Sequence, residues 1–124
     1  MAGRHSEKFL ALVEEARQRI QELSVEQLKE KLDRGEAFRL LDVREGEEFA
    51  RGRLPGAASL CKGIIERDIE QRVPDPATPI VLYCGGGFRS ALAAATLQRM
   101  GYKNVYSMWG GWRAWNEAGF PVEK

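Results

Sequence analysis

The segment from residue 79 to residue 95 (PIVLYCGGGFRSALAAA) constrains the fold more than any other part of the chain. Residues 80–83 are continuously apolar, which is typical of a strand buried on both faces of a parallel sheet. Residues 90–100 are rich in alanine and leucine and precede Gly101, so they predict a helix that ends there. Between them lie a cysteine, three glycines, an aromatic residue and an arginine. Such a turn directs free backbone N–H groups toward one point, where the helix dipole also favours negative charge.

Cys84 is the first residue after the predicted strand and is expected at the floor of this turn. A helix N-terminus and a nearby cation such as Arg89 stabilise a thiolate, which is the nucleophilic form of cysteine. Gly85, Gly86 and Gly87 let the backbone curl round the sulfur, because glycine tolerates positive φ and carries no Cβ. A lone cysteine at a strand end more often only packs. The combination in one turn favours a catalytic Cys84.

Four motifs follow one another between residues 24 and 124. They are LDVRE with EF at 48–49, GRLPGA at 52–57, the Cys84–Arg89 loop with Ser90, and a C-terminal group of glycines and aromatic residues (101–102, 104–106, 110–112 and 115). In this order they resemble the single-domain rhodaneses, a family of sulfurtransferases. Members often have histidine where this chain has Arg53, so the chain carries an additional cation ahead of Leu-Pro-Gly-Ala.

Strand and helix signals alternate along the chain, which favours a parallel sheet with helices on both faces. The resemblance implies the same class, an α/β rhodanese-like domain with a central five-stranded parallel sheet, over residues 23–124. We expect strands near 20–23, 38–43, 57–60, 80–83 and 104–108, and helices near 24–34, 45–51, 64–71, 90–100 and after 111. Apolar residues at helical spacing between 5 and 19 predict an amphipathic helix. Residues 1–22 are therefore expected to be a helical extension, laid on the domain or on a partner.

The resemblance implies that the protein transfers sulfane sulfur. Cys84 would take the outer sulfur of a donor such as thiosulfate, release sulfite, and become a persulfide that cyanide, a thiol or a protein acceptor discharges. Backbone N–H groups from Gly85 to Ser90 would hold the anionic outer sulfur. Arg89 would either clamp an oxyanion of the donor or brace the loop, and Phe88 would shield the persulfide from water. The expected chemistry uses no metal, nucleotide or flavin.

Several further residues are candidates for supporting roles. Asp42 and Arg44 end the predicted strand at 38–43, at the edge where open parallel sheets bind ligands, and we expect them to be structural. Arg53 is a candidate for binding anionic donors. Trp109 and Trp112 follow the last strand; core packing is the default for such aromatic residues, with Trp112 expected to be structural near the site, and walling the site is the alternative. Cys61 is either a packing residue or a thiol that resolves an oxidised Cys84. His5, the one histidine, lies near a terminus that is expected to fray, and it receives no catalytic role.

The composition excludes several other classes of protein. With 124 residues, the chain is expected to form one domain with a substantial core. Nineteen basic and eighteen acidic residues leave a net charge of +1, which gives no field to recruit nucleic acid or an anionic membrane. No apolar run reaches the length of a membrane span, and no signal-peptide core is present, so a cytoplasmic location is expected. Two cysteines form no disulfide framework, and the expected state is a monomer or a homodimer through the N-terminal helix.

Two alternatives keep the fold but change the function. Cysteine phosphatases and some arsenate reductases also place a cysteine and an arginine in an anion-binding loop, but with five residues between them. Here four residues separate Cys84 from Arg89, and the tighter loop suits a sulfur atom better than a tetrahedral phosphate or arsenate. Rhodanese-like domains can also serve as sulfur relays or docking modules. Pure docking is disfavoured because both Cys84 and Arg89 are present.

Overall fold

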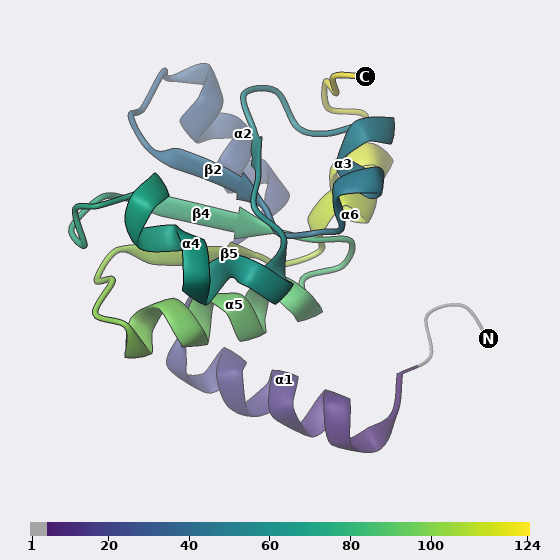
Figure 1. Ribbon diagram of the computed structural model, residues 1–124. Coiled ribbons are helices and arrows are strands. Elements are labelled where there is room, and N and C mark those ends of the chain that lie inside the picture. Colours follow the sequence, from purple (N-terminus) through teal and green to yellow (C-terminus); the bar gives the residue numbers. More distant parts are fainter. Residues whose placement is uncertain (1–4) are drawn as a thin grey trace.

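A computed structural model describes residues 5–124 as a five-stranded sheet between helices (Figure 1). The strands are all parallel and lie in the order β1-β5-β4-β2-β3. Their bounds are β1 (Gln21–Leu23), β2 (Arg39–Asp42), β3 (Ala58–Ser59), β4 (Ile80–Tyr83) and β5 (Val105–Met108). The α/β class with a five-stranded parallel sheet is therefore confirmed.

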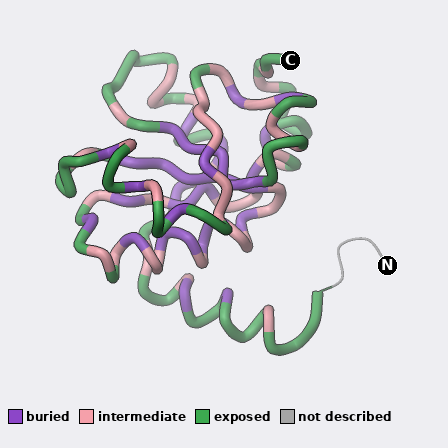
Figure 2. The backbone as a smooth tube through the Cα atoms, in the orientation of Figure 1, coloured by how far each residue is buried: buried purple, intermediate pink, exposed green. Residues whose placement is uncertain are grey.

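Six α-helices alternate with the strands. They are α1 (Glu7–Arg19), α2 (Val25–Asp33), α3 (Gly46–Arg51), α4 (Ile65–Arg72), α5 (Phe88–Arg99) and α6 (Gly111–Glu117), with one 3₁₀ turn, η1 (Lys62–Ile64), ahead of α4. One core packs α4 and α5 against one face of the sheet, and a second packs α2 and α6 against the other. Helices thus cover both faces, and the central strands β2, β4 and β5 are mostly buried (Figure 2). None of these helices is long and apolar enough to cross a membrane.

The continuous apolar run becomes the middle strand of the sheet, as its composition predicts. Every residue of β4 is buried, and β4 pairs with β2 on one side and β5 on the other. Because both faces of β4 meet helices, neither face can carry a polar side chain without a partner. The carboxyl end of β4 opens directly into the loop that begins at Cys84.

The N-terminal helix α1 lies outside the two sheet-covering layers and packs along α5 (Figure 1). Val13 and Ala16 are buried against Ala91 of α5, so this face of α1 is covered by its own chain, whereas Leu10 and Leu12 of the same helix are exposed. β1 pairs with β5, so the expected division between residues 22 and 23 falls inside a strand of the sheet. Residues 1–4 of the expected extension lie outside the described part of the chain.

Local boundaries differ from the sequence expectations by a few residues. The capping box at Ser24 and Gln27 is confirmed, with both reciprocal bonds in place at 3.1 and 2.8 Å. Helix α5 begins at Phe88, two residues before the expected start, because Gly87 adopts φ +109° and reverses the chain in one step. The predicted strand at 57–60 reduces to two residues of β3, which sits at the sheet edge and pairs only with β2.

Candidate active site

The loop between β4 and α5 surrounds the sulfur of Cys84 with hydrogen-bond donors. The backbone N–H groups of Gly87 and Ser90 point at the Cys84 Sγ with N···S distances of 3.2 and 3.4 Å. The Cys84 thiol donates to the Ser90 Oγ at 3.6 Å, and the Ser90 Oγ lies 2.8 Å from the Ser107 Oγ on β5. Of the amides expected to face the sulfur, these two are within hydrogen-bonding distance of it. Such donors favour a negative charge on the sulfur atom.

The opposite side of the loop is held by the first turn of α6. The N–H groups of Gly110, Trp112 and Arg113 donate to the carbonyl oxygens of Gly86, Cys84 and Gly85 at 3.1, 2.8 and 3.0 Å, respectively. The orphan donors of one helix end thus bind the loop carbonyls, which leaves the loop N–H groups free to face the sulfur. Two helix N-termini, those of α5 and α6, therefore meet at Cys84. In the sequence, the Gly110-Gly111 pair marks the turn at which this helix begins.

We expect Gly111→Ala to distort the loop and destabilise the fold. A Cβ at Gly111 would lie 2.8 Å from the carbonyl carbon of Gly85 and even closer to the Cys84 carbonyl oxygen, and Gly111 has φ +56°. Gly35→Ala is the matched control, because Gly35 has φ +68° but open space around it. Urea unfolding should show about 2 kcal/mol more destabilisation for Gly111→Ala than for the control. Equal losses would show that the loop can move aside without strain.

Arg89 is oriented by an ion pair rather than pointing freely at the sulfur. Its Nη1 lies 2.9 Å from Oε1 of Glu48 on α3, and a second bond spans 3.4 Å. Burial lowers the pKa of Arg89, but the Glu48 hydrogen bond and the charges of Cys84 and Glu48 outweigh it, and the pKa is raised. The bond from Arg89 likewise lowers the pKa of Glu48. The sequence identified Glu48 only as part of the motif at 48–49 and gave it no role in the site, since only the fold brings α3 to this loop.

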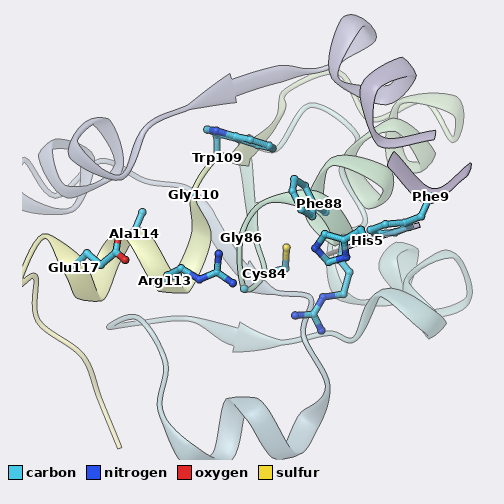
Figure 3. Close-up of a pocket in the computed structure, with 12 residues that line it drawn as sticks. His5, Phe9, Cys84, Gly86, Phe88, Trp109, Gly110, Arg113, Ala114 and Glu117 are labelled. Carbon is cyan, nitrogen blue, oxygen red and sulfur yellow. The ribbon is translucent and has the colours of Figure 1, made fainter. Parts of the chain in front are cut away.

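A cavity of about 500 Å³ opens onto Cys84 (Figure 3). Cys84 itself is only 1% exposed, so this cavity is the route by which a reactant reaches its sulfur. The described lining residues come from α1 and the residue segment before it, the β4–α5 loop with the first turn of α5, and the β5–α6 turn with α6: His5, Phe9, Cys84, Gly85, Gly86, Phe88, Arg89, Trp109, Gly110, Arg113, Ala114 and Glu117. In the view of Figure 3 the sulfur lies between Arg113 on one side and the His5–Phe88 ring pair on the other.

The cavity includes some predicted residues and leaves out others. Trp109 lines it, whereas Trp112 packs its ring 4.7 Å from the guanidinium carbon of Arg44. Arg53 is not among the described lining residues; it donates to the Phe49 carbonyl oxygen at 3.2 Å and lies 3.8 Å from Glu123. The cation that shares the cavity with Arg89 is instead Arg113, which sequence reasoning missed. Its position on the outer side of α6 gave no signal in the sequence.

Asp42 and Arg44 form a buried ion pair beneath the site. Asp42 is fully buried and accepts bonds from the backbone N–H and the guanidinium of Arg44, the shortest at 2.7 Å. The Tyr83 hydroxyl donates to Asp42 Oδ2 at 2.7 Å and accepts from the Leu54 N–H at 3.1 Å. Burial, together with the charge of Asp42, raises the pKa of Tyr83. Since Arg44 also binds the Gly52 carbonyl oxygen at 2.7 Å, the network ties the Gly52–Leu54 turn to the sheet.

Cys61, the second cysteine, is free and only partly buried. Its thiol lies 3.2 Å from Oε2 of Glu45. A hydrogen bond from Gly63 lowers the pKa of the Cys61 thiol, but burial and the Glu45 carboxylate outweigh it, and the pKa is raised. A neutral thiol is a poor nucleophile, so this environment favours the packing role over the resolving role. Within residues 5–124, no three His, Cys, Asp or Glu side chains cluster closely enough to hold a metal ion.

The fold and the site together define a class of protein: single parallel α/β domains in which a cysteine ends the central strand and is surrounded by the amides of the following loop. The sequence profile of the rhodanese-like domain family matches residues 24–118. The chain belongs to this family, and the resemblance inferred from the motifs is confirmed. Helix α1 lies outside the matched region.

Named relatives and a solved structure extend this comparison. The chain is 39% identical over 84 residues to the thiosulfate sulfurtransferase GlpE of Actinobacillus succinogenes, covering 68% of this chain and 74% of that protein. It is 34% identical over 96 residues (77% of this chain) to YrkF of Bacillus subtilis, named as a candidate sulfur carrier protein, and spans about half (51%) of its length. A Rhodopseudomonas palustris structure, described as a protein of unknown function and possible tyrosine phosphatase, matches with a TM-score of 0.85 at 34% identity over 99% of both chains.

Proposed function

We propose that this protein is a sulfurtransferase that moves a sulfane sulfur from thiosulfate or a persulfide donor to cyanide or a thiol. One observation carries the proposal: the Cys84 sulfur lies at the floor of an open cavity with the N–H groups of Gly87 and Ser90 directed at it. Preorganised donors at this position stabilise the Cys84 thiolate that attacks the donor, and the cavity beyond the sulfur has room for the second sulfur of a persulfide. The names of the relatives support the same chemistry.

The reaction takes place in two steps, transfer of the sulfur to Cys84 and its transfer from Cys84 to the acceptor. The Cys84 thiolate attacks the outer sulfur of thiosulfate, a new bond forms between the two sulfur atoms, and the sulfur–sulfur bond of thiosulfate breaks so that its electron pair leaves with sulfite. The terminal sulfur of the Cys84 persulfide is then attacked by cyanide or a thiolate. The new sulfur–sulfur bond breaks, its electron pair returns to Cys84, and thiocyanate or an organic persulfide departs. This is covalent catalysis with alternating donor and acceptor.

Intact-mass spectrometry after incubation with thiosulfate tests the proposal. We expect the mass to increase by one sulfur atom, located at Cys84 by peptide mapping, and to return to the original value when cyanide is added. Thiocyanate should appear in the same amount as the sulfur that is lost. If the mass does not change, or if the added sulfur resides on Cys61, then the proposed route is wrong.

We expect Arg113→Ala to raise the KM for thiosulfate about tenfold, because a hydrogen bond to a charged group contributes about 1.5 kcal/mol or more. Arg113 faces the same cavity as Cys84, while Arg53 binds Phe49 and Glu123 instead. Arg53→Ala is the matched control and should change KM by less than about twofold. Raising the salt concentration should weaken thiosulfate binding in the wild type more than in Arg113→Ala. A larger KM effect at Arg53 would place the donor-binding cation there.

A sulfur relay to a protein acceptor uses the same persulfide, and the naming of YrkF supports considering it. Steady-state turnover with thiosulfate and cyanide separates the two functions. In an efficient small-molecule enzyme, both formation of the persulfide by thiosulfate and its discharge by cyanide are fast. In a relay, the persulfide is discharged slowly unless the acceptor protein is present. The persulfide in that case accumulates and persists in the mass spectrum.

The description of the Rhodopseudomonas palustris structure raises phosphate-ester hydrolysis as a second candidate. Four residues lie between Cys84 and Arg89 here, one fewer than in the cysteine phosphatase loop. We therefore expect no hydrolysis of an aryl phosphate. Turnover of such an ester that is lost in Cys84→Ser would favour the phosphatase.

A further inference from the structure

The cavity above Cys84 is much larger than an inorganic sulfur donor. Its volume of about 500 Å³ equals that of roughly seventeen water molecules in the liquid, whereas thiosulfate consists of two sulfur and three oxygen atoms. Cavities of a few hundred Å³ or more are typical of sites for organic ligands. The size therefore leaves most of the cavity unexplained by thiosulfate alone.

One side of this cavity is a continuous aromatic surface. The Phe88 ring lies 4.7 Å from the His5 ring in an edge-on arrangement, 5.4 Å from the Trp109 ring, and 6.2 Å from the Phe9 ring. Phe9, Phe88 and Trp109 are half-buried, and His5 is exposed, so all four still present surface to the cavity. We call these four residues the aromatic wall. Contiguous exposed apolar surface that is rimmed by polar residues marks sites where ligands or partners bind.

The N-terminal helix both supplies and fixes this wall. His5 precedes α1 and Phe9 lies in its first turns, on the face that packs against α5 through Val13. Farther along α1, the Arg17 guanidinium lies 3.3 Å from the centre of the Trp109 ring. Two hydrogen bonds of 2.9 and 3.1 Å hold the Arg17 guanidinium to the Glu22 carboxylate. The guanidinium is therefore fixed in position, and it in turn holds the Trp109 ring in place. A segment outside the family match thus completes the site of this chain.

We propose that the aromatic wall makes this enzyme selective for organic sulfane-sulfur donors that carry an aromatic or other apolar group next to the reacting sulfur. The inference rests on the proposed function and adds the substrate class. The anionic end of the donor lies between Arg89 and Arg113, and its apolar group lies against Phe9 and Phe88. Burial of that group against the rings stabilises the complex in proportion to the apolar area removed from water.

Thiosulfonates give suitable probes because their reaction balances in the same way as that of thiosulfate. The Cys84 thiolate attacks the terminal sulfur, the sulfur–sulfur bond of the thiosulfonate breaks, and the electron pair leaves with the sulfinate. Benzenethiosulfonate carries a ring and methanethiosulfonate carries only a methyl group. Their ratio of kcat/KM, compared between variants and wild type, cancels the difference in their intrinsic reactivity.

We expect Phe9→Ala to lower the ratio of kcat/KM for benzenethiosulfonate over methanethiosulfonate about fivefold, and His5→Ala to lower it about twofold. His5 is exposed, so its replacement tests the wall without disturbing the packing of α1. Leu10→Ala is the matched control: Leu10 follows Phe9 on α1, is 40% exposed and does not line the cavity. Its ratio should equal that of the wild type. An unchanged ratio in both Phe9→Ala and His5→Ala overturns the proposal.

A binding measurement separates this inference from the proposed function. We expect benzenesulfonate to shift the indole N–H resonance of Trp109 in Cys84→Ser at lower concentration than methanesulfonate does. That preference should weaken when Phe9→Ala is added. One outcome separates the two proposals: no donor produces a persulfide, yet benzenesulfonate still binds more tightly than methanesulfonate and Phe9→Ala weakens that preference. The proposed function then fails, while the ligand class stands. Equal shifts by both sulfonates refute the aromatic wall as a binding surface, even if thiosulfate is turned over.

Discussion

Cys84→Ser is expected to reduce thiosulfate-dependent sulfur transfer by about a thousandfold or more, to the background of the uncatalysed reaction. A serine hydroxyl remains protonated near neutral pH and cannot carry the transferred sulfur as a persulfide. The loop donors lose the sulfur, but a serine hydroxyl can still accept from the N–H groups of Gly87 and Ser90. The expected readouts are loss of thiocyanate production and loss of the one-sulfur increase in mass.

The fold should survive this change, which makes the loss of activity interpretable. Cys84 is 1% exposed and borders the apolar core, but its sulfur already makes polar contacts, so the serine oxygen has partners where it stands. Urea unfolding should give a free energy within about 1.5 kcal/mol of the wild type. Cys61→Ser is the matched control and should retain the persulfide. Sulfur transfer by Cys84→Ser would refute Cys84 as the nucleophile.

Asp42→Asn is expected to destabilise the protein by about 3–5 kcal/mol, the largest effect on stability that we predict. Arg44 is 3% exposed and would keep its charge in the interior with its only described carboxylate partner removed. The amide of Asn also turns a donor toward a site filled with donors, namely the Arg44 guanidinium and the Tyr83 hydroxyl. Urea unfolding with an unchanged m value measures the loss.

The control for Asp42 is an exposed ion pair of the same chemistry. Asp33 accepts from Lys29 at 2.7 Å, but its side chain is 61% exposed, so water screens the pair and replaces it when it is lost. Asp33→Asn should therefore leave the unfolding free energy close to that of the wild type. If Asp42→Asn lowers the free energy of unfolding only slightly, then the buried network positions the Gly52–Leu54 turn but adds little to stability.

Much of the site could be predicted from the sequence because its central parts are contiguous. An apolar run, a cysteine, three glycines and a helix within residues 79–95 fix the strand, the loop and the helix that follows, and local geometry alone aims the Gly87 and Ser90 amides at the sulfur. Asp42 and Arg44 could be assigned to the edge of the sheet that carries Cys84, because they end a neighbouring parallel strand. The carboxyl ends of such strands share one edge of the sheet.

The cavity walls could not be predicted, because they come from segments distant in sequence. The pairing of Arg89 with Glu48 spans 41 positions, and the position of Arg113 depends on how the first turn of α6 binds the loop carbonyls. Arg53 was expected at the site because it is a cation in a matched motif. The structure instead directs its guanidinium to Phe49 and Glu123, since the adjoining turn is anchored through Gly52 and Leu54.

The sequence by itself determined the parallel α/β class, the rhodanese-like family and the cysteine at the end of the central strand. These depend on periodicity and on short-range spacing, which a single chain displays directly. Only the tertiary structure decided what surrounds that cysteine: which cation shares its cavity, and that His5 and Phe9 from the N-terminal segment face it. The physical reason is that side chains from distant segments meet only after the helices have packed, and the direction of a surface helix such as α1 is set by the partner it packs against.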